Sequence, residues 1–269
     1  MPRRYKLPKS IRPSRPARHQ KKKTTKMVKA MTKVAERVFH KNAENKLVVA
    51  HNGNNPGGDQ RYSYALGFNS SISGSGDLYQ LIPQISQGTT EGTRIGNTIR
   101  PRSLVIRGIV GANQAYSDSA TLMARIFVAS PVNYKSYNQL TSAAADLSQL
   151  LDFGQFGTGG FQGYPSDVDA KVNTKLWRVH KQKTFKIVKA SGTGSGQSAP
   201  TGTAEHRFTM KIPCPKTLKF SQDSDLLPEN FSPYLMIAYV DPSLTSGSPD
   251  YANQRIVASW SVDFEYEDA

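Results

Sequence analysis

The sequence predicts an all-β protein: an eight-stranded jelly-roll sandwich with a basic N-terminal arm and one short inserted helix. Three observations lead to this fold class. Positive charge is concentrated in the first 46 residues, eight later segments have the composition or alternation of strands, and polar loops rich in Gly, Ser, Pro and Asn separate most of them. A chain of 269 residues can form such a sandwich as one domain.

The arm, residues 1–46, contains 16 Lys or Arg and two acids, Glu36 and Glu44. The rest of the chain contains 19 basic residues and 18 acids, so the net charge of +15 divides into +14 and +1. A near-neutral body can meet other proteins without strong self-repulsion. The arm is expected to bind a polyanion, because neutralising phosphates releases condensed counterions.

Two parts of the arm differ in composition. Residues 1–23 contain four prolines and almost no apolar side chains, which predicts a segment that is disordered until it binds. Residues 24–46 lack proline, and Met27, Met31, Val34 and Val38 repeat with a helical period beside a basic stripe. We expect an amphipathic helix there.

The expected nucleic-acid-binding residues are the basic side chains of the first part and of the helical stripe. They are Arg3, Arg4, Lys6, Lys9, Arg12, Arg15, Arg18, Lys21, Lys22, Lys23, Lys26, Lys29, Lys33 and Arg37. Aromatic residues are scarce among them, so the arm is expected to bind phosphate and not base sequence.

Three interpretations of the arm compete. It can be a targeting or solubilising tail, a membrane-surface helix, or a nucleic-acid-binding tail. Thirteen basic residues with no acid through Lys33 exceed what an import signal needs, which favours the third interpretation. Nuclear import and nucleic-acid binding can share the same residues.

Residues 47–60 are predicted to be a linker, and residues 61–269 the jelly-roll domain. The predicted strands are 61–68, 104–110, 121–130, 172–179, 183–189, 205–213, 234–240 and 255–266. The last strand is the clearest, because apolar residues occupy every second position from Ile256 to Tyr266, which places Trp260 and Phe264 in the core. Only residues 137–151 are expected to be helical within the body.

Two segments resemble a known family. Gly88-Thr-Thr-Glu-Gly-Thr-Arg-Ile-Gly-Asn-Thr-Ile99, followed by Arg102-Ser-Leu-Val-Ile-Arg-Gly108, resembles a segment of small viral capsid proteins. The likeness is to coat proteins of circular, Rep-encoding single-stranded DNA viruses (circovirus-like) and, more distantly, of small plant RNA and satellite viruses. Trp177-Arg-Val-His-Lys-Gln-Lys-Thr-Phe-Lys-Ile187 resembles a later strand of the same family.

The resemblance implies a capsid protein that self-assembles into a small icosahedral (T=1) shell of about sixty copies. It implies packaging of a viral single-stranded genome, DNA rather than RNA, and a location in the virion and, during assembly, the host nucleus. Host import and surface receptors are further possible partners, and no membrane is expected. The alternative is a cellular nucleic-acid-binding structural protein of ribosomal or chromatin type, which explains the arm but not the charge-balanced body.

No catalytic, cofactor or metal site is expected. The histidines lack a metal-ligand spacing, the glycine-rich runs lack the Lys-Ser/Thr of a phosphate-binding loop, and Cys214 has no nearby histidine. Asp223, Asp225 and Glu229 have the composition of a calcium site, but the start of a helix or turn in a polar loop is the favoured interpretation. A single cysteine excludes an intrachain disulfide, and no apolar run is long enough to span a bilayer.

Overall fold

The computed structural model describes residues 27–34, 44–51, 62–64, 78–112, 120–189, 205–240, 242 and 256–268. The chain divides into two units, Met1–Ala43 and Glu44–Ala269. Residues 27–34 form a helix in the first unit, and the second unit contains the strands. Within the described part of the chain, no helix is long and apolar enough to cross a membrane.

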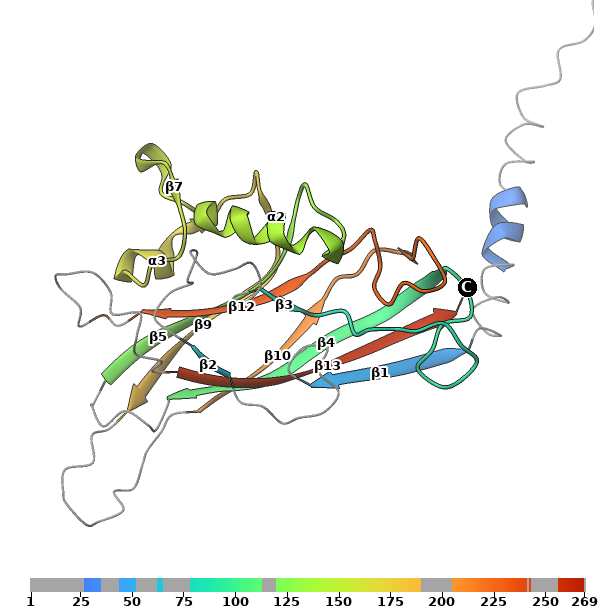
Figure 1. Ribbon diagram of the computed structural model, residues 1–269, viewed down its shortest axis with the longest axis horizontal. Coiled ribbons are helices and arrows are strands. Elements are labelled where there is room, and N and C mark those ends of the chain that lie inside the picture. The colour runs from blue at the N-terminus through green and yellow to red at the C-terminus, as the bar shows by residue number, and fades with distance from the viewer. Residues whose placement is uncertain are drawn as a thin grey trace, which may run out of the picture. The chain divides into compact units, whose positions relative to one another are not determined.

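Two large antiparallel sheets make up most of the second unit (Figure 1). The first sheet has the order β1 (Asn45–His51), β13 (Ile256–Asp268), β4 (Thr98–Ala112) and β10 (His206–Ile212). The second has the order β3 (Tyr79–Gln80), β12 (Tyr234–Val240), β5 (Ala120–Pro131) and β9 (Trp177–Lys189). Two short strands extend the first sheet: β2 (Tyr62–Tyr64) pairs with β13, and β11 (Leu218–Lys219) pairs with β4.

The order of these strands defines the fold. Numbered along the chain, the eight main strands have the order 1-8-3-6 in one sheet and 2-7-4-5 in the other. Every consecutive pair except β5 and β9 therefore crosses from one sheet to the other. This double-sheet arrangement is a jelly roll, so the predicted fold class is confirmed.

The core lies between the inner faces of the two sheets. Alternate residues of β13 are at most 2% exposed, namely Ile256, Ala258, Trp260, Val262, Phe264 and Tyr266. Trp260 packs edge-on against Tyr79, with ring centroids 4.9 Å apart, and so joins the first sheet to the second. The predicted burial of Trp260 and Phe264 is confirmed.

Gly108 of β4 makes room for the aromatic rings of this core. Phe208 and Trp260 stand opposite Gly108 on its two neighbouring strands. A Cβ atom at position 108 would lie 2.5 Å from Cζ of Phe208. Packing therefore accounts for the glycine that ends the Arg102–Gly108 segment.

A helical insertion between β5 and β9 lies over the outer face of the second sheet (Figure 1). Its elements are η2 (Tyr137–Gln139), α2 (Leu140–Ala145), η3 (Asp146–Gln149), η4 (Gly154–Phe156), α3 (Pro165–Asp169) and a small sheet of β7 (Thr158–Gly159), β6 (Leu151–Asp152) and β8 (Lys171–Val172). Phe161 packs edge-on against Phe127 of β5, at 6.4 Å between ring centroids. The buried Arg125 donates hydrogen bonds to the carbonyls of Asp167 (2.7 Å) and Ala170 (2.8 Å), which ties the insertion to the sheet.

The predicted helix 137–151 is confirmed as a continuous helical stretch from η2 to η3, although Leu151 already belongs to β6. Five predicted strands, 104–110, 121–130, 205–213, 234–240 and 255–266, correspond to β4, β5, β10, β12 and β13. Of the predicted strand 61–68, residues 62–64 form β2, and the others lie outside the described residues.

Two of the predicted strands, 172–179 and 183–189, were wrongly separated. One strand, β9, runs from Trp177 to Lys189, and a turn at 173–176 separates it from β8. The strand continues through the polar stretch 180–184 because it pairs with β5 along its whole length, with a bulge opposite Val128 and Ala129. The main strands β1 and β3 were not predicted.

The predicted boundary between helix and linker is also wrong. Asn45 and Lys46 were assigned to the helix 24–46, and residues 47–51 to the linker 47–60, but all seven form β1. Leu47 and Val49 are about half exposed while Lys46 is buried, so the segment has the alternation of a strand at the border of a sheet. Pairing with β13 decides its conformation.

Candidate nucleic-acid interface

The first unit contains the predicted phosphate-binding residues. Lys29 and Lys33 lie in the helix 27–34, are exposed, and share one face because they are four residues apart. Met27, Val28, Met31 and Val34 of the same helix are each more than half exposed. The other predicted residues lie outside the described residues, namely Arg3, Arg4, Lys6, Lys9, Arg12, Arg15, Arg18, Lys21, Lys22, Lys23, Lys26 and Arg37.

Lys46 marks the point where the chain enters the jelly roll. Its side chain is 2% exposed, and its Nζ lies 2.6 Å from Oδ2 of Asp268 and 2.6 Å from the carbonyl oxygen of Thr93. Glu44 lies farther away, at 3.7 Å from the same Nζ. The charge of Lys46 is therefore neutralised inside the body. Residues 1–43, with 15 basic residues and Glu36, still carry the +14 of the arm.

Arg94 belongs to the segment that resembles viral capsid proteins, and it is completely buried. Its Nη1 donates to the carbonyl of Gly96 and to Oδ1 of Asn97, both at 2.7 Å. Its Nη2 donates to three carbonyls of the loop after β11, those of Gln222, Asp223 and Asp225, each at 2.9 Å.

The guanidinium group also stacks on the ring of Phe220, 4.2 Å from its centroid. Burial lowers the pKa of Arg94, and the carboxylates of Asp223 and Asp225 oppose that shift. Arginine remains protonated in proteins even so. Arg94 thus holds two loops together, and this role could not be read from its position in the sequence.

The carboxylates considered for calcium lie in the loop that Arg94 holds. Oδ2 of Asp225 accepts a hydrogen bond from the backbone N–H of Gln222 at 2.9 Å, and the carboxylate of Glu229 accepts one from Ser221. Three backbone carbonyls of that loop accept hydrogen bonds from the guanidinium group of Arg94. No cluster of three or more His, Cys, Asp or Glu in the described residues could hold a metal ion.

A second concentration of basic residues lies on the jelly roll. Residues 170–189 contain seven Lys or Arg and no acid. Six of them are exposed, and we call them the β9 basic surface: Lys171, Lys175, Arg178, Lys181, Lys183 and Lys186. None of the six is among the binding residues expected from the sequence, although the acid-free run was a usable signal.

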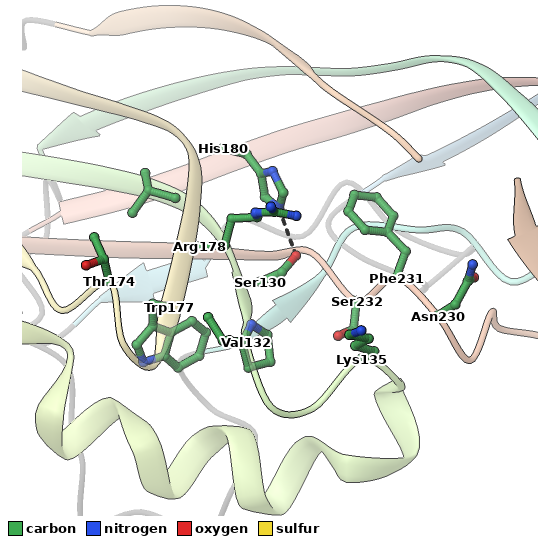
Figure 2. Close-up of a pocket in the computed structure, with 12 residues that line it drawn as sticks. Ser130, Val132, Lys135, Thr174, Trp177, Arg178, His180, Asn230, Phe231 and Ser232 are labelled. Atoms are coloured by element: carbon green, nitrogen blue, oxygen red, sulfur yellow. Dashed lines mark hydrogen bonds between the residues drawn. The ribbon is translucent and has the colours of Figure 1, made fainter. Parts of the chain in front are cut away.

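A pocket of about 650 Å³ opens where β9 begins (Figure 2). Oγ of Ser130 and Nε2 of His180 are hydrogen-bonded at 2.8 Å within it, and the ring of Phe231 stands edge-on to His180 at 5.6 Å. Arg178 and Lys135 also line this Ser130–His180 pocket. Burial lowers the pKa of His180, and the nearby charge of Arg178 lowers it further, so His180 is largely neutral at pH 7.

Neither Ser130 nor Cys214 has the surroundings of an activated nucleophile. None of the twelve residues that line the Ser130–His180 pocket is Asp or Glu, so no carboxylate orients His180 there as in a Ser-His-Asp triad. Burial raises the pKa of Cys214 to about 12, which keeps its thiol protonated and unreactive at neutral pH.

No protein-family model and no curated protein sequence matches the chain. Among solved structures, it is similar to a chain of the Israel acute paralysis virus pentamer, with 13% identity over 84% of this chain and 68% of that one and a TM-score of 0.23. It is also similar to the Macrobrachium rosenbergii nodavirus structure, with 11% identity, 100% and 59% coverage and a TM-score of 0.24. The infectious bursal disease virus VP2 subviral particle is similar at 9% identity, 84% and 42% coverage and a TM-score of 0.15. At such low TM-scores, these likenesses carry no argument on function.

Proposed function

We propose that this chain is a viral capsid protein whose jelly-roll body self-assembles into a shell and whose arm binds single-stranded nucleic acid inside it. One observation carries the proposal: +14 of the net charge lies in residues 1–43, and the jelly roll that follows has +1. Jelly rolls occur in viral capsids but also in lectins and cupins, so the fold alone does not select a function. The joined basic arm favours the capsid.

The finer proposal follows the resemblance to coat proteins of circular single-stranded DNA viruses. A shell of about sixty copies would bring about 840 positive charges to the genome, enough to neutralise a large share of a genome of about one to two kilobases. On this proposal the genome is DNA, the protein resides in the virion and, during assembly, in the host nucleus, and the arm also meets an import receptor.

An exposed aromatic residue supports self-assembly. Phe156 is 83% exposed at the tip of the β6–β7 hairpin. Gly154 and Gly157 on either side have φ angles of +67° and +88°, values that favour glycine and shape this tight tip. Aromatic side chains that enter a pocket on the partner are typical anchors of protein interfaces. We expect Phe156 to contact a neighbouring copy in the shell.

Electron microscopy of the purified full chain with a single-stranded DNA of genome length tests the proposal. The expected result is closed particles of uniform diameter that protect the DNA from nuclease. A soluble monomer that binds DNA without forming particles would overturn it and favour the cellular nucleic-acid-binding alternative.

The substitution Phe156→Ser tests the shell contact. It should reduce particle yield at least tenfold while leaving the unfolding temperature unchanged, because the side chain contributes little to the monomer. Leu226→Ser, which removes another exposed apolar side chain, serves as the matched control and should assemble normally. Normal assembly of Phe156→Ser would exclude the hairpin from the contacts between copies.

A further inference from the structure

The near-neutral charge of the jelly roll conceals an uneven distribution. Seven of the 19 basic residues that follow residue 46 lie in residues 170–189, and the acid-free run extends from Ala170 to Ala204. The rest of the body therefore has twelve basic residues and 18 acids. Like charges gathered in one region repel each other and lower the stability of the fold. A polyanion partner would explain why the basic residues are nevertheless concentrated there.

The basic side chains of the two sheets differ in their partners. On the first sheet, Arg102 forms an ion pair with Glu267 and Arg107 with Asp263. Within the described residues, none of the six cations of the β9 basic surface has an ion-pair partner. Their charge is thus available to an external anion.

The strand that carries most of these cations is the last of its sheet. In the order β3-β12-β5-β9, β9 pairs with β5 on one side only. Side chains of both faces can reach past such an edge, so Lys181 and Lys183 on one face and Lys186 on the other can line the same extended ligand. An extended, flexible polyanion fits this linear arrangement better than a rigid duplex does.

The Ser130–His180 pocket continues this surface at the start of β9. Arg178 belongs to both, and Lys135 adds a second exposed cation to the pocket. Phe231, which is half-buried, also lines the pocket, with its aromatic ring edge-on to His180 (Figure 2). A volume of about 650 Å³ is in the range of small-ligand pockets. Cations for a phosphate and a ring for a base are the two elements of single-strand binding sites.

We propose that the β9 basic surface and the Ser130–His180 pocket together form a second single-stranded nucleic-acid-binding site, on the folded body, with one nucleotide seated in the pocket. The proposal rests on the proposed function, because it takes the polyanion to be the packaged strand. The arm would gather the nucleic acid by charge, and the body would hold a short length of it in a fixed place.

Edge strands are also protected from aggregation by lysines, and this role is the main competing explanation. Protection explains lysines at the middle of β9. It does not explain the additional unpaired cations at Lys171, Lys175 and Lys135 or a pocket whose lining residues include no carboxylate. The two explanations differ in whether nucleic-acid binding changes when the lysines are removed.

The first experiment measures binding of a fluorescent oligothymidylate to the full chain over a range of salt concentrations. The triple variant Lys181→Gln, Lys183→Gln, Lys186→Gln should reduce the slope of log Kobs against log salt by about 2, because each phosphate contact on a single strand contributes about 0.7. The matched control Arg100→Gln, Lys216→Gln, Lys219→Gln removes three exposed cations from the first sheet and the loop beside it, and should leave the slope unchanged.

The second experiment locates the strand. Photocrosslinking of a 4-thiothymidine oligonucleotide, read by peptide mass spectrometry, should mark residues 178–180 and 230–232 besides the arm. Crosslinks confined to residues 1–43, or equal slopes for the two triple variants, would overturn the body site while leaving the proposed function intact. A wild-type chain that binds no oligothymidylate would instead overturn the proposed function.

Discussion

Lysine and arginine have different environments in the jelly roll and in the arm. In the jelly roll, Arg94 and Lys46 are almost completely buried, and carbonyls and a carboxylate of the protein surround their charged groups. In the helix of the arm, Lys29 and Lys33 are exposed, with no ion-pair partner among the described residues. The buried Lys and Arg side chains of the jelly roll therefore hold loops and strands together, whereas the exposed cations of the arm, like those of the β9 basic surface, remain available to a ligand.

This difference predicts opposite effects of substitution. Removing a buried cation leaves acceptors or a carboxylate without a partner, which lowers the free energy of unfolding. Removing an exposed cation of the arm should leave that free energy unchanged and weaken nucleic-acid binding. Urea unfolding below the concentration of assembly measures the first effect, and the nucleic-acid content of particles measures the second.

Arg94→Met should have the largest effect on stability, about 3–5 kcal/mol, because the five oxygens that bind the guanidinium group lose their donor. Arg94→Lys keeps the charge, but the single ammonium nitrogen cannot reach all five oxygens. This variant should therefore lose about half as much unfolding free energy as Arg94→Met. A loss below about 1 kcal/mol for Arg94→Met would show that the loop after β11 does not depend on this clamp.

Lys46→Met should lower the free energy of unfolding by about 2–3 kcal/mol, because Oδ2 of Asp268 and the carbonyl oxygen of Thr93 both lose the ammonium group they contact. Oδ1 of Asp268 keeps its hydrogen bond from the N–H of Ile95, which limits the loss. A double-mutant cycle with Asp268→Asn measures the energy of the Lys46–Asp268 ion pair. A coupling energy near zero would show that this pair does not stabilise the fold.

Arg107→Gln should cost less than about 1 kcal/mol, although Arg107 also forms an ion pair, because its side chain is 54% exposed and water screens the charge. High salt should weaken the effect further. If Arg107→Gln lowered the free energy of unfolding as much as Lys46→Met does, the degree of burial would not determine how much a cation contributes to the stability of this protein.

Deletion of residues 1–23 should change the free energy of unfolding of the body least of all, because these residues lie outside the unit that forms the jelly roll. It removes ten basic residues, so particles of the shortened chain should lose most of their nucleic acid, measured by the absorbance ratio at 260 and 280 nm. Particles with normal nucleic-acid content would show that the first part of the arm does not package the genome.

Features with a local cause were predictable from the sequence. Strand β13 alternates because successive residues of a strand face opposite sides, and Trp260 and Phe264 accordingly lie in the core. The helix in the insertion and the positions of five strands followed from the same kind of pattern. The separation of charge between arm and body is a property of the sequence itself.

Features that join distant segments were decided only by the tertiary structure. By local pattern, Asn45 and Lys46 continue a helix and residues 47–51 belong to a linker, but β13, more than 200 residues later, pairs with the whole of Asn45–His51. Lys46 then forms an ion pair with Asp268. Arg94 lies in a recognisable segment, but three of its five hydrogen-bond acceptors lie beyond residue 220. Whether a basic residue is free or paired depends on which carboxylates folding brings near it, and that information is absent from the local pattern. The unpaired cations of β9 and the pocket beside them could be identified only once the two sheets had formed.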